Sequence, residues 1–130
     1  MEICPPLSRS IAGRTAIITG AASGMGGATA ILFASEGAKV AVTDLNQASC
    51  DAVVAEIRAS GGTANAYTLD VSNHDAIKSV VANIASDFGG IDILVNNAGI
   101  SAFCPLDTGD EYDAIWDRAL AILLTAHQRT

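Results

Sequence analysis

A glycine-rich run between an apolar segment and a helical pattern constrains the fold of this chain more than any other feature. The run is Thr19–Gly26, and it follows the apolar segment Thr15–Ile18. Glycines allow a sharp turn and a close approach of the backbone to a ligand. The helix behind them directs free N–H groups and the positive end of its dipole toward an anion. The pattern predicts a diphosphate-binding turn, although a strand-to-helix turn without a ligand fits the same residues.

Apolar segments alternate with helical patterns along the rest of the chain. Strands are expected at residues 15–19, 39–43, 64–69 and 91–95. Helices are expected at 24–36, 47–60 and 72–88, and a last helix starts near residue 110. This order, βαβαβαβα, requires crossover connections. It predicts an α/β fold, a Rossmann-type parallel sheet with helices on both faces, truncated after the last helix.

Local signals mark the ends and the buried faces of the expected helices. Gly37, Gly61–Gly62 and Gly89–Gly90 are typical of helix ends. Ser72 and Asp75 have the spacing of a capping box at the start of the third helix. Apolar stripes at helical spacing predict buried faces. The stripes are Cys50, Val53, Val54 and Ile57; Ile77, Val80, Val81, Ile84 and Phe88; and Tyr112, Ile115, Trp116, Ala119 and Leu123.

Composition limits the class of protein. The chain has 130 residues, of which half are hydrophobic and 16% are charged, so we expect a globular chain. We expect residues 1–12 to be a flexible leader and residues 13–130 to be one domain. A net charge of −7 argues against nucleic acid as a partner.

The sequence also predicts the compartment. The apolar runs are too short to span a membrane, and the N-terminus lacks the pattern of a signal peptide. Cys4, Cys50 and Cys104 fit neither a disulfide framework nor a metal site, so we expect free thiols, no bound metal and a cytoplasmic protein.

Polar or small residues follow each of the later strands. Asp44 can accept hydrogen bonds from the ribose hydroxyls of an adenosine and would repel a 2′-phosphate, which favours NAD over NADP, or it can cap the next helix. Asp70–Val71 can contact the amino group of adenine, or Asp70 can be an acid at a helix start. Asn96–Gly99 leaves room for a cofactor and can brace the strand ends, or it can be an ordinary turn. Ligands of open α/β sheets bind at this edge.

Together these motifs resemble the N-terminal half of the short-chain dehydrogenase/reductase family over about residues 13–130. The resemblance rests on Thr19-Gly20-x-x-x-Gly24-x-Gly26, Asp44, Asp70–Val71, Asn96–Gly99 and Trp116–Asp117. It implies that residues 13–130 are a partial NAD(P)-binding Rossmann domain of an oxidoreductase that transfers hydride between NAD and a small alcohol or ketone substrate. It also implies a homo-oligomer built through the last helix. The implied cofactor-binding residues are Gly20, Ser23, Gly24, Met25, Gly26, Asp44, Asp70, Val71, Asn97, Ala98 and Gly99.

The catalytic residues of that family are not matched in this chain. The family uses a Ser and a Tyr-x-x-x-Lys that would lie beyond residue 130, and neither Tyr67 nor Tyr112 is followed by such a Lys. Leu123 stands where the family has an Asn of the proton relay. His127 is expected to be exposed or at an interface, and His74 to be a surface residue of a first helical turn. We therefore expect no catalytic residue here and no activity from this chain alone.

Two other functions stay open at this point. The chain could be a dinucleotide-binding module without catalysis, or an oligomerisation module whose last helix joins a partner. In either case the strand at 91–95 would present an unpaired edge and the last helix would be partly uncovered. We therefore expect the isolated chain to associate or to be marginally stable.

Overall fold

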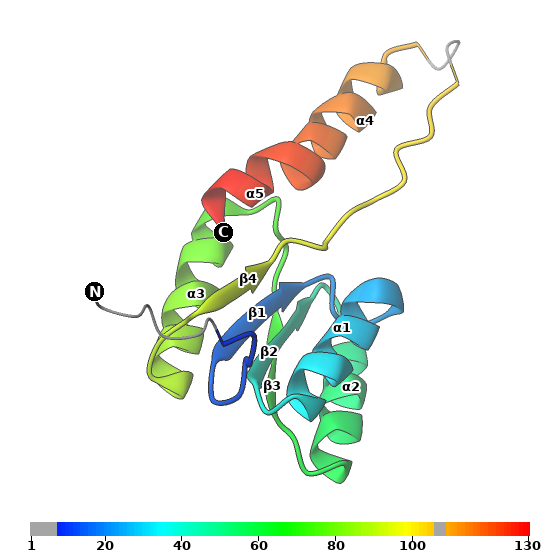
Figure 1. Ribbon diagram of the computed structural model, residues 1–130. Coiled ribbons are helices and arrows are strands. Elements are labelled where there is room, and N and C mark those ends of the chain that lie inside the picture. Colours follow the sequence, from blue (N-terminus) through cyan, green and yellow to red (C-terminus); the bar gives the residue numbers. More distant parts are fainter. Residues whose placement is uncertain (1–7, 106–108) are drawn as a thin grey trace, which may run out of the picture.

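The fold is a four-stranded parallel sheet with helices on both faces (Figure 1). The computed structural model describes residues 8–105 and 109–130, so most of the expected leader, Cys4 included, lies outside the described residues. The elements in chain order are β1 (Thr15–Thr19), α1 (Gly24–Ser35), β2 (Lys39–Asp44), α2 (Gln47–Ala59), β3 (Thr63–Thr68), α3 (His74–Phe88), β4 (Ile93–Val95), α4 (Glu111–Leu120), the π-helical segment η1 (Ala121–Thr125) and α5 (Ala126–Arg129). The predicted order of elements and the Rossmann-type fold are confirmed.

The strands are arranged β3-β2-β1-β4, so the chain crosses the sheet after β3. In β1, Ile17 pairs with Ala41 of β2 and with Leu94 of β4. Within the described residues no strand pairs with the outer side of β4, as the sequence led us to expect. The sheet therefore places the carboxyl ends of its four strands along one edge, where the predicted site residues lie.

Side chains that alternate along the strands separate two cores. Ile18 of β1 packs with the buried residues of α1 and α2, among them Ala30, Cys50 and Ile57. Ile17, the next residue back, faces the other side and packs with Ile84 of α3. The apolar stripes predicted for the second and third helices are the faces that these helices bury.

Glycines end the first three helices as predicted, and at the third the C-cap Gly89 has a positive φ of 81°. Gly37, the residue after the C-cap Glu36 of α1, adopts a positive φ of 87°, and the following amide, that of Ala38, donates to the carbonyl of Phe33. Gly61 does the same after α2, with a φ of 84°. The ends of α1 and α2 are therefore Schellman motifs, which satisfy carbonyl groups that a helix end would leave open.

The predicted capping box at the start of the third helix is wrong. The N-cap of α3 is Asn73, whose side-chain oxygen accepts the N–H of Ala76 at 3.0 Å. Ser72 points elsewhere, because its hydroxyl and its N–H both donate to Asp70. Both Ser and Asn suit an N-cap, and a contact with Asp70 decided which one serves.

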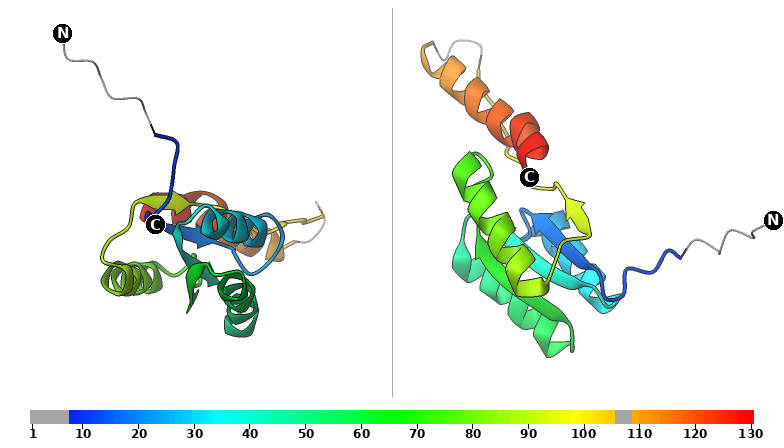
Figure 2. Two further views of the ribbon diagram at one scale, coloured as in Figure 1. Left: turned by 60° about the horizontal axis from the view of Figure 1, so that its bottom comes forward. Right: turned by 90° about the vertical axis from the view of Figure 1, so that its left-hand side faces the viewer.

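The last helix runs without a break through α4, η1 and α5, and it extends away from the sheet (Figure 2, right). Its inner end is buried at Ile122 and Ala126, and α5 contacts α3. Its outer part exposes large apolar side chains: Tyr112, Trp116, Leu120, Leu123 and Leu124. The stripe predicted there is real, but in this chain it is largely uncovered. None of the helices in the described part of the chain is both long and apolar enough to cross a membrane.

Candidate dinucleotide-binding site

The glycine-rich loop after β1 can be made only with glycine at two of its positions. Gly20 has a positive φ of 66°, and a Cβ there would lie 2.8 Å from the Cα of Ala98. A Cβ on Gly26 would lie 2.1 Å from the carbonyl oxygen of Gly20. The first turn of α1 therefore packs directly on the loop, and the loop backbone is held close to the strand ends.

Helix α1 begins without a side-chain cap. Its N-cap residue Ser23 has an extended backbone, and its hydroxyl makes no capping hydrogen bond. Ser23, Gly24 and Met25 are exposed. The first amides of a helix have no partner within the helix, so this uncapped end offers donors and a positive dipole end to an anion.

Asp44 ends β2 beside this loop. Its Oδ2 accepts the N–H of Ala22 at 3.0 Å, and its Oδ1 accepts the N–H of Leu45 at 2.7 Å. The alternative in which Asp44 caps the next helix is wrong, because Asn46 is the N-cap of α2 and accepts the N–H of Ser49. A carboxylate has about four lone-pair positions, so Asp44 can still accept two further bonds.

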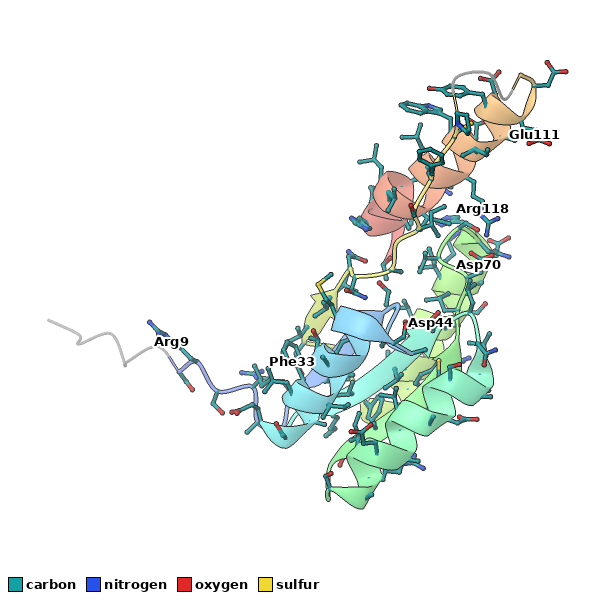
Figure 3. All side chains as sticks on the ribbon, turned by 90° about the vertical axis from the view of Figure 1, so that its right-hand side faces the viewer. Arg9, Phe33, Asp44, Asp70, Glu111 and Arg118 are labelled. Carbon is teal, nitrogen blue, oxygen red and sulfur yellow. The ribbon has the colours of Figure 1, made fainter. Side chains whose placement is uncertain are left out.

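Asp70 follows β3 and lies on the same edge of the sheet. Its Oδ1 accepts the hydroxyl of Ser72 at 2.6 Å and the N–H of Ser72 at 2.9 Å. These two bonds lower the pKa of Asp70; burial opposes them, and the positive charge of Arg118 lowers the pKa further as the smallest of these effects. Figure 3 shows Asp44 and Asp70 at one end of the sheet, with Arg118 of α4 above Asp70. Asp70 is therefore ionised at neutral pH and can accept from a ligand amino group.

Asn97 braces the loop. Its side-chain nitrogen Nδ2 donates to the carbonyl oxygens of Thr19 and Gly20, at 3.0 and 3.1 Å. The backbone N–H groups of Asn97 and Ala98 both donate to the hydroxyl oxygen of Thr19. The sequence reading did not select Thr19 as a site residue. A polar side chain at the last position of a buried strand was the available signal.

A cavity of about 450 Å³ joins these elements. Its walls include predicted residues from all four strand ends: Gly20, Ser23, Met25, Asp44, Asp70, Val71, Asn97, Ala98 and Gly99. Leu45, Leu69, Ile100 and Ile122 complete the lining and were not predicted. Gly24 and Gly26 are not part of these walls; Gly26 lies buried beneath the loop. The volume falls within the range of small-molecule sites, and contacts with a cofactor stay a prediction.

Leu123, His127 and His74 are not part of the cavity wall. Leu123 packs against Gly99, since a Cβ added to Gly99 would lie 3.2 Å from the Leu123 Cδ2. His127 is exposed, as expected. His74 is in the first turn of α3 but is partly buried, and its Nδ1 has no hydrogen-bond partner among the described residues. Cys50 and Cys104, the cysteines of the described part, are not joined by a disulfide, and no metal-binding cluster occurs among the described residues.

Comparison with known proteins gives the family. The profile of the family described as short chain dehydrogenase matches residues 14–130. The chain belongs to the short-chain dehydrogenase/reductase family. It is 40% identical over 120 residues to a short chain dehydrogenase/reductase from Colletotrichum higginsianum, covering 92% of this chain and 44% of that protein. It is 42% identical over 112 residues to a 3-oxoacyl-(acyl-carrier-protein) reductase from Thermotoga maritima, covering 86% and 45%.

Solved structures agree with this assignment to the short-chain dehydrogenase/reductases. A metagenomic short-chain oxidoreductase in complex with NADP superimposes with a TM-score of 0.82 at 38% identity, covering 90% of this chain and 52% of that chain. A hydroxysteroid dehydrogenase from Escherichia coli gives a TM-score of 0.85 at 36% identity, covering 92% and 49%. The chain spans about half the length of the relatives that it matches.

Proposed function

We propose that this chain is the cofactor-binding portion of an NAD-dependent oxidoreductase. The carboxylate of Asp44 is the observation that supports the proposal most strongly. It lies in the cavity wall beside the glycine-rich loop and keeps acceptor positions open. Such a carboxylate can accept hydrogen bonds from ribose hydroxyl groups.

The same carboxylate favours NAD over NADP. A 2′-phosphate next to Asp44 would place two negative groups side by side, and juxtaposed like charges cost several kcal/mol. Among the described residues that line the cavity, none is an Arg or Lys that could offset this repulsion. One solved relative is in complex with NADP, so family membership alone leaves the choice open.

The residues present fit a dinucleotide along the whole edge. The uncapped start of α1 would take the pyrophosphate, Asp44 the adenosine ribose, and Asp70 with Val71 the adenine. Asn97, Ala98 and Gly99 would line the cofactor beyond the pyrophosphate. When bound, the nicotinamide would supply hydride transfer to or from an alcohol or ketone. The chain's own part is to bind and orient that cofactor.

Turnover requires groups that this sequence does not hold. Neither Tyr67 nor Tyr112 has a Lys four residues later, and Leu123 cannot donate or accept a proton. We propose that the chain binds the cofactor and is inactive alone. An assay for NADH formation with a panel of secondary alcohols should give no turnover. Measurable turnover would overturn this part of the proposal.

Calorimetric titration tests the cofactor itself. We expect NAD to bind and NADP to bind at least about tenfold more weakly. Asp44→Ala should bring the affinities for NAD and NADP closer together. Asp51→Ala is the matched control, because Asp51 is an exposed acid of α2 outside the cavity walls. Absence of heat and of any shift in melting temperature at millimolar NAD would contradict cofactor binding, and tighter binding of NADP would contradict the NAD preference.

We also propose that the protein is a homo-oligomer through the outer face of the last helix. Tyr112 and Trp116 stack there at 6.5 Å, and Trp116 and Leu124 are 54% and 65% exposed. Such a run of apolar side chains marks an interaction surface. Sedimentation of the purified chain tests this, and a stable monomer at high concentration would contradict it.

A further inference from the structure

We propose that Asp44 is a positioning residue that holds the glycine-rich loop before any ligand is bound. The inference rests on the proposed dinucleotide site and adds a second role for its acidic residue. The contact that carries it is the 3.0 Å hydrogen bond from the N–H of Ala22 to the Asp44 Oδ2. A hydrogen bond to an ionised acceptor is about twice as strong as a neutral one.

Three successive loop residues form hydrogen bonds with neighbouring strand ends. The carbonyl of Gly20 accepts the side-chain amide of Asn97, beyond β4, at 3.1 Å. The N–H of Ala21 donates to the backbone carbonyl of Thr43 in β2 at 3.0 Å. The N–H of Ala22 donates to the side chain of Asp44. Of these two hydrogen bonds to β2, from Ala21 and from Ala22, only the one from Ala22 has a side chain as its acceptor.

The hydrogen bond from Ala22 to Asp44 is also the last of these three bonds before the uncapped start of α1. The next residue, Ser23, is exposed and its hydroxyl caps nothing, so the first amides of α1 have no support from that side chain. The direction of these amides depends on where Ala22 is held. Fixing donors before a ligand arrives improves binding, because less ordering remains to be done on association.

The geometry leaves room for both roles of the carboxylate. Asp44 accepts one backbone N–H on each oxygen, from Ala22 and from Leu45. Two of about four acceptor positions stay open toward the cavity that Asp44 lines. Replacing Asp44 to admit a 2′-phosphate would therefore also release the loop that is meant to hold the pyrophosphate.

Hydrogen exchange of the Ala22 amide in the ligand-free chain tests the positioning role directly. Asp44→Ala removes the acceptor, and we expect exchange to be faster by about fivefold or more, the equivalent of one hydrogen bond. Asp44→Asn keeps one neutral acceptor oxygen, which can face either Ala22 or Leu45, and should restore part of the protection. Asp51→Ala, which removes the same charge nearby, should leave exchange unchanged. Unchanged exchange in Asp44→Ala would overturn the proposal.

Two ligands separate this role from the ribose contact. ADP carries both ribose hydroxyls, whereas 2′,3′-dideoxy-ADP carries the pyrophosphate without them. Asp44→Ala and Asp44→Asn both remove the negative charge beside the pyrophosphate, but only Asp44→Asn keeps an acceptor oxygen. We therefore expect Asp44→Ala to bind dideoxy-ADP about fivefold more weakly than Asp44→Asn does. Equal or tighter binding of dideoxy-ADP by Asp44→Ala than by Asp44→Asn would overturn the positioning role. If neither ligand binds any variant, the proposed function fails, while the exchange experiment still decides the role of Asp44.

Discussion

Two regions of the molecule differ in how their positions are determined. One is the junction of loops at the carboxyl edge of the sheet, and the other is the last helix. The junction comprises Thr19–Gly26, Asp44 and Asn96–Gly99, and hydrogen bonds between residues distant in sequence connect its parts. The last helix, Glu111–Arg129, is held mainly by its inner end, where Ile122 and Ala126 are buried. The junction is built to hold one geometry, whereas the outer helix keeps an apolar face open.

The largest expected effect is a substitution inside the junction. Gly26→Ala would place a methyl group 2.1 Å from the Gly20 carbonyl oxygen, so we expect a loss of about 3 kcal/mol in unfolding free energy. Urea denaturation measures it. Gly27→Ala is the matched control, because its nearest neighbour would be 3.4 Å away, at the Ala21 oxygen, and Ala is the better helix former. Equal stabilities of the two variants would contradict the tight fit of the loop.

A second substitution tests the hydrogen bonds of the junction without changing its volume much. Thr19→Val removes the hydroxyl that accepts the partly buried N–H groups of Asn97 and Ala98. The Asn97 N–H keeps the Val95 carbonyl at 3.1 Å, whereas the Ala98 N–H loses its Thr19 acceptor, and we expect a loss of about 2 kcal/mol in unfolding free energy. Thr43→Val is the comparison. Thr43 is equally buried but only donates one bond, to the Ile18 carbonyl, so we expect a loss of about 1 kcal/mol. Urea denaturation measures both losses of unfolding free energy. A smaller loss for Thr19→Val than for Thr43→Val would argue against a junction organised by Thr19.

Asp70 and Arg118 lie where the two regions meet, and the pKa of Asp70 reports on both. Its pKa is lowered chiefly by the hydroxyl and the N–H of Ser72, and only then by the charge of Arg118. A lowered pKa contributes stability that is present above the unfolded value and is lost as pH falls through the folded value. Ser72→Ala should therefore raise the pKa of Asp70 more than Arg118→Gln does. Carboxyl NMR titration measures both shifts, and the reverse order would mean that α4 is held more firmly against the junction.

The parts that the sequence predicted are those set by local rules. The 3.6-residue stripes, the bounds of the first three strands and the left-handed glycines after α1 and α2 each depend on a few neighbouring residues. The last strand, expected at 91–95, is shorter and covers Ile93–Val95. The meeting of Asp44 and Asp70 at one edge also followed, since parallel strands end on the same side. Family membership then confirmed the fold that these signals predicted.

The parts that it missed depend on contacts across the fold. The bond between Asp44 and Ala22 joins β2 to the loop after β1, and Thr19 accepts amides that lie 78 and 79 positions later. No pattern of neighbouring residues in the sequence predicts that these groups form hydrogen bonds. The choice of Asn73 over Ser72 as the cap of α3 was decided by Asp70 in the same way. The π-helical turn at Ala121–Thr125 gave no recognisable signal, and its Ile122 lines the cavity.

The smallest expected effect on stability lies on the outer helix. Trp116, the single tryptophan of the chain, is 54% exposed and contacts Tyr112 by ring stacking. Replacing it with Glu should change the free energy of unfolding by no more than about 0.5 kcal/mol, as for other surface positions. The same change should reduce self-association in sedimentation, because it places a charge in the apolar face. Asp113→Ala is a matched control on the same exposed helix and should leave association unchanged. A large loss of stability in Trp116→Glu would mean that this face is covered even in the single chain, and the contrast with the junction would then disappear.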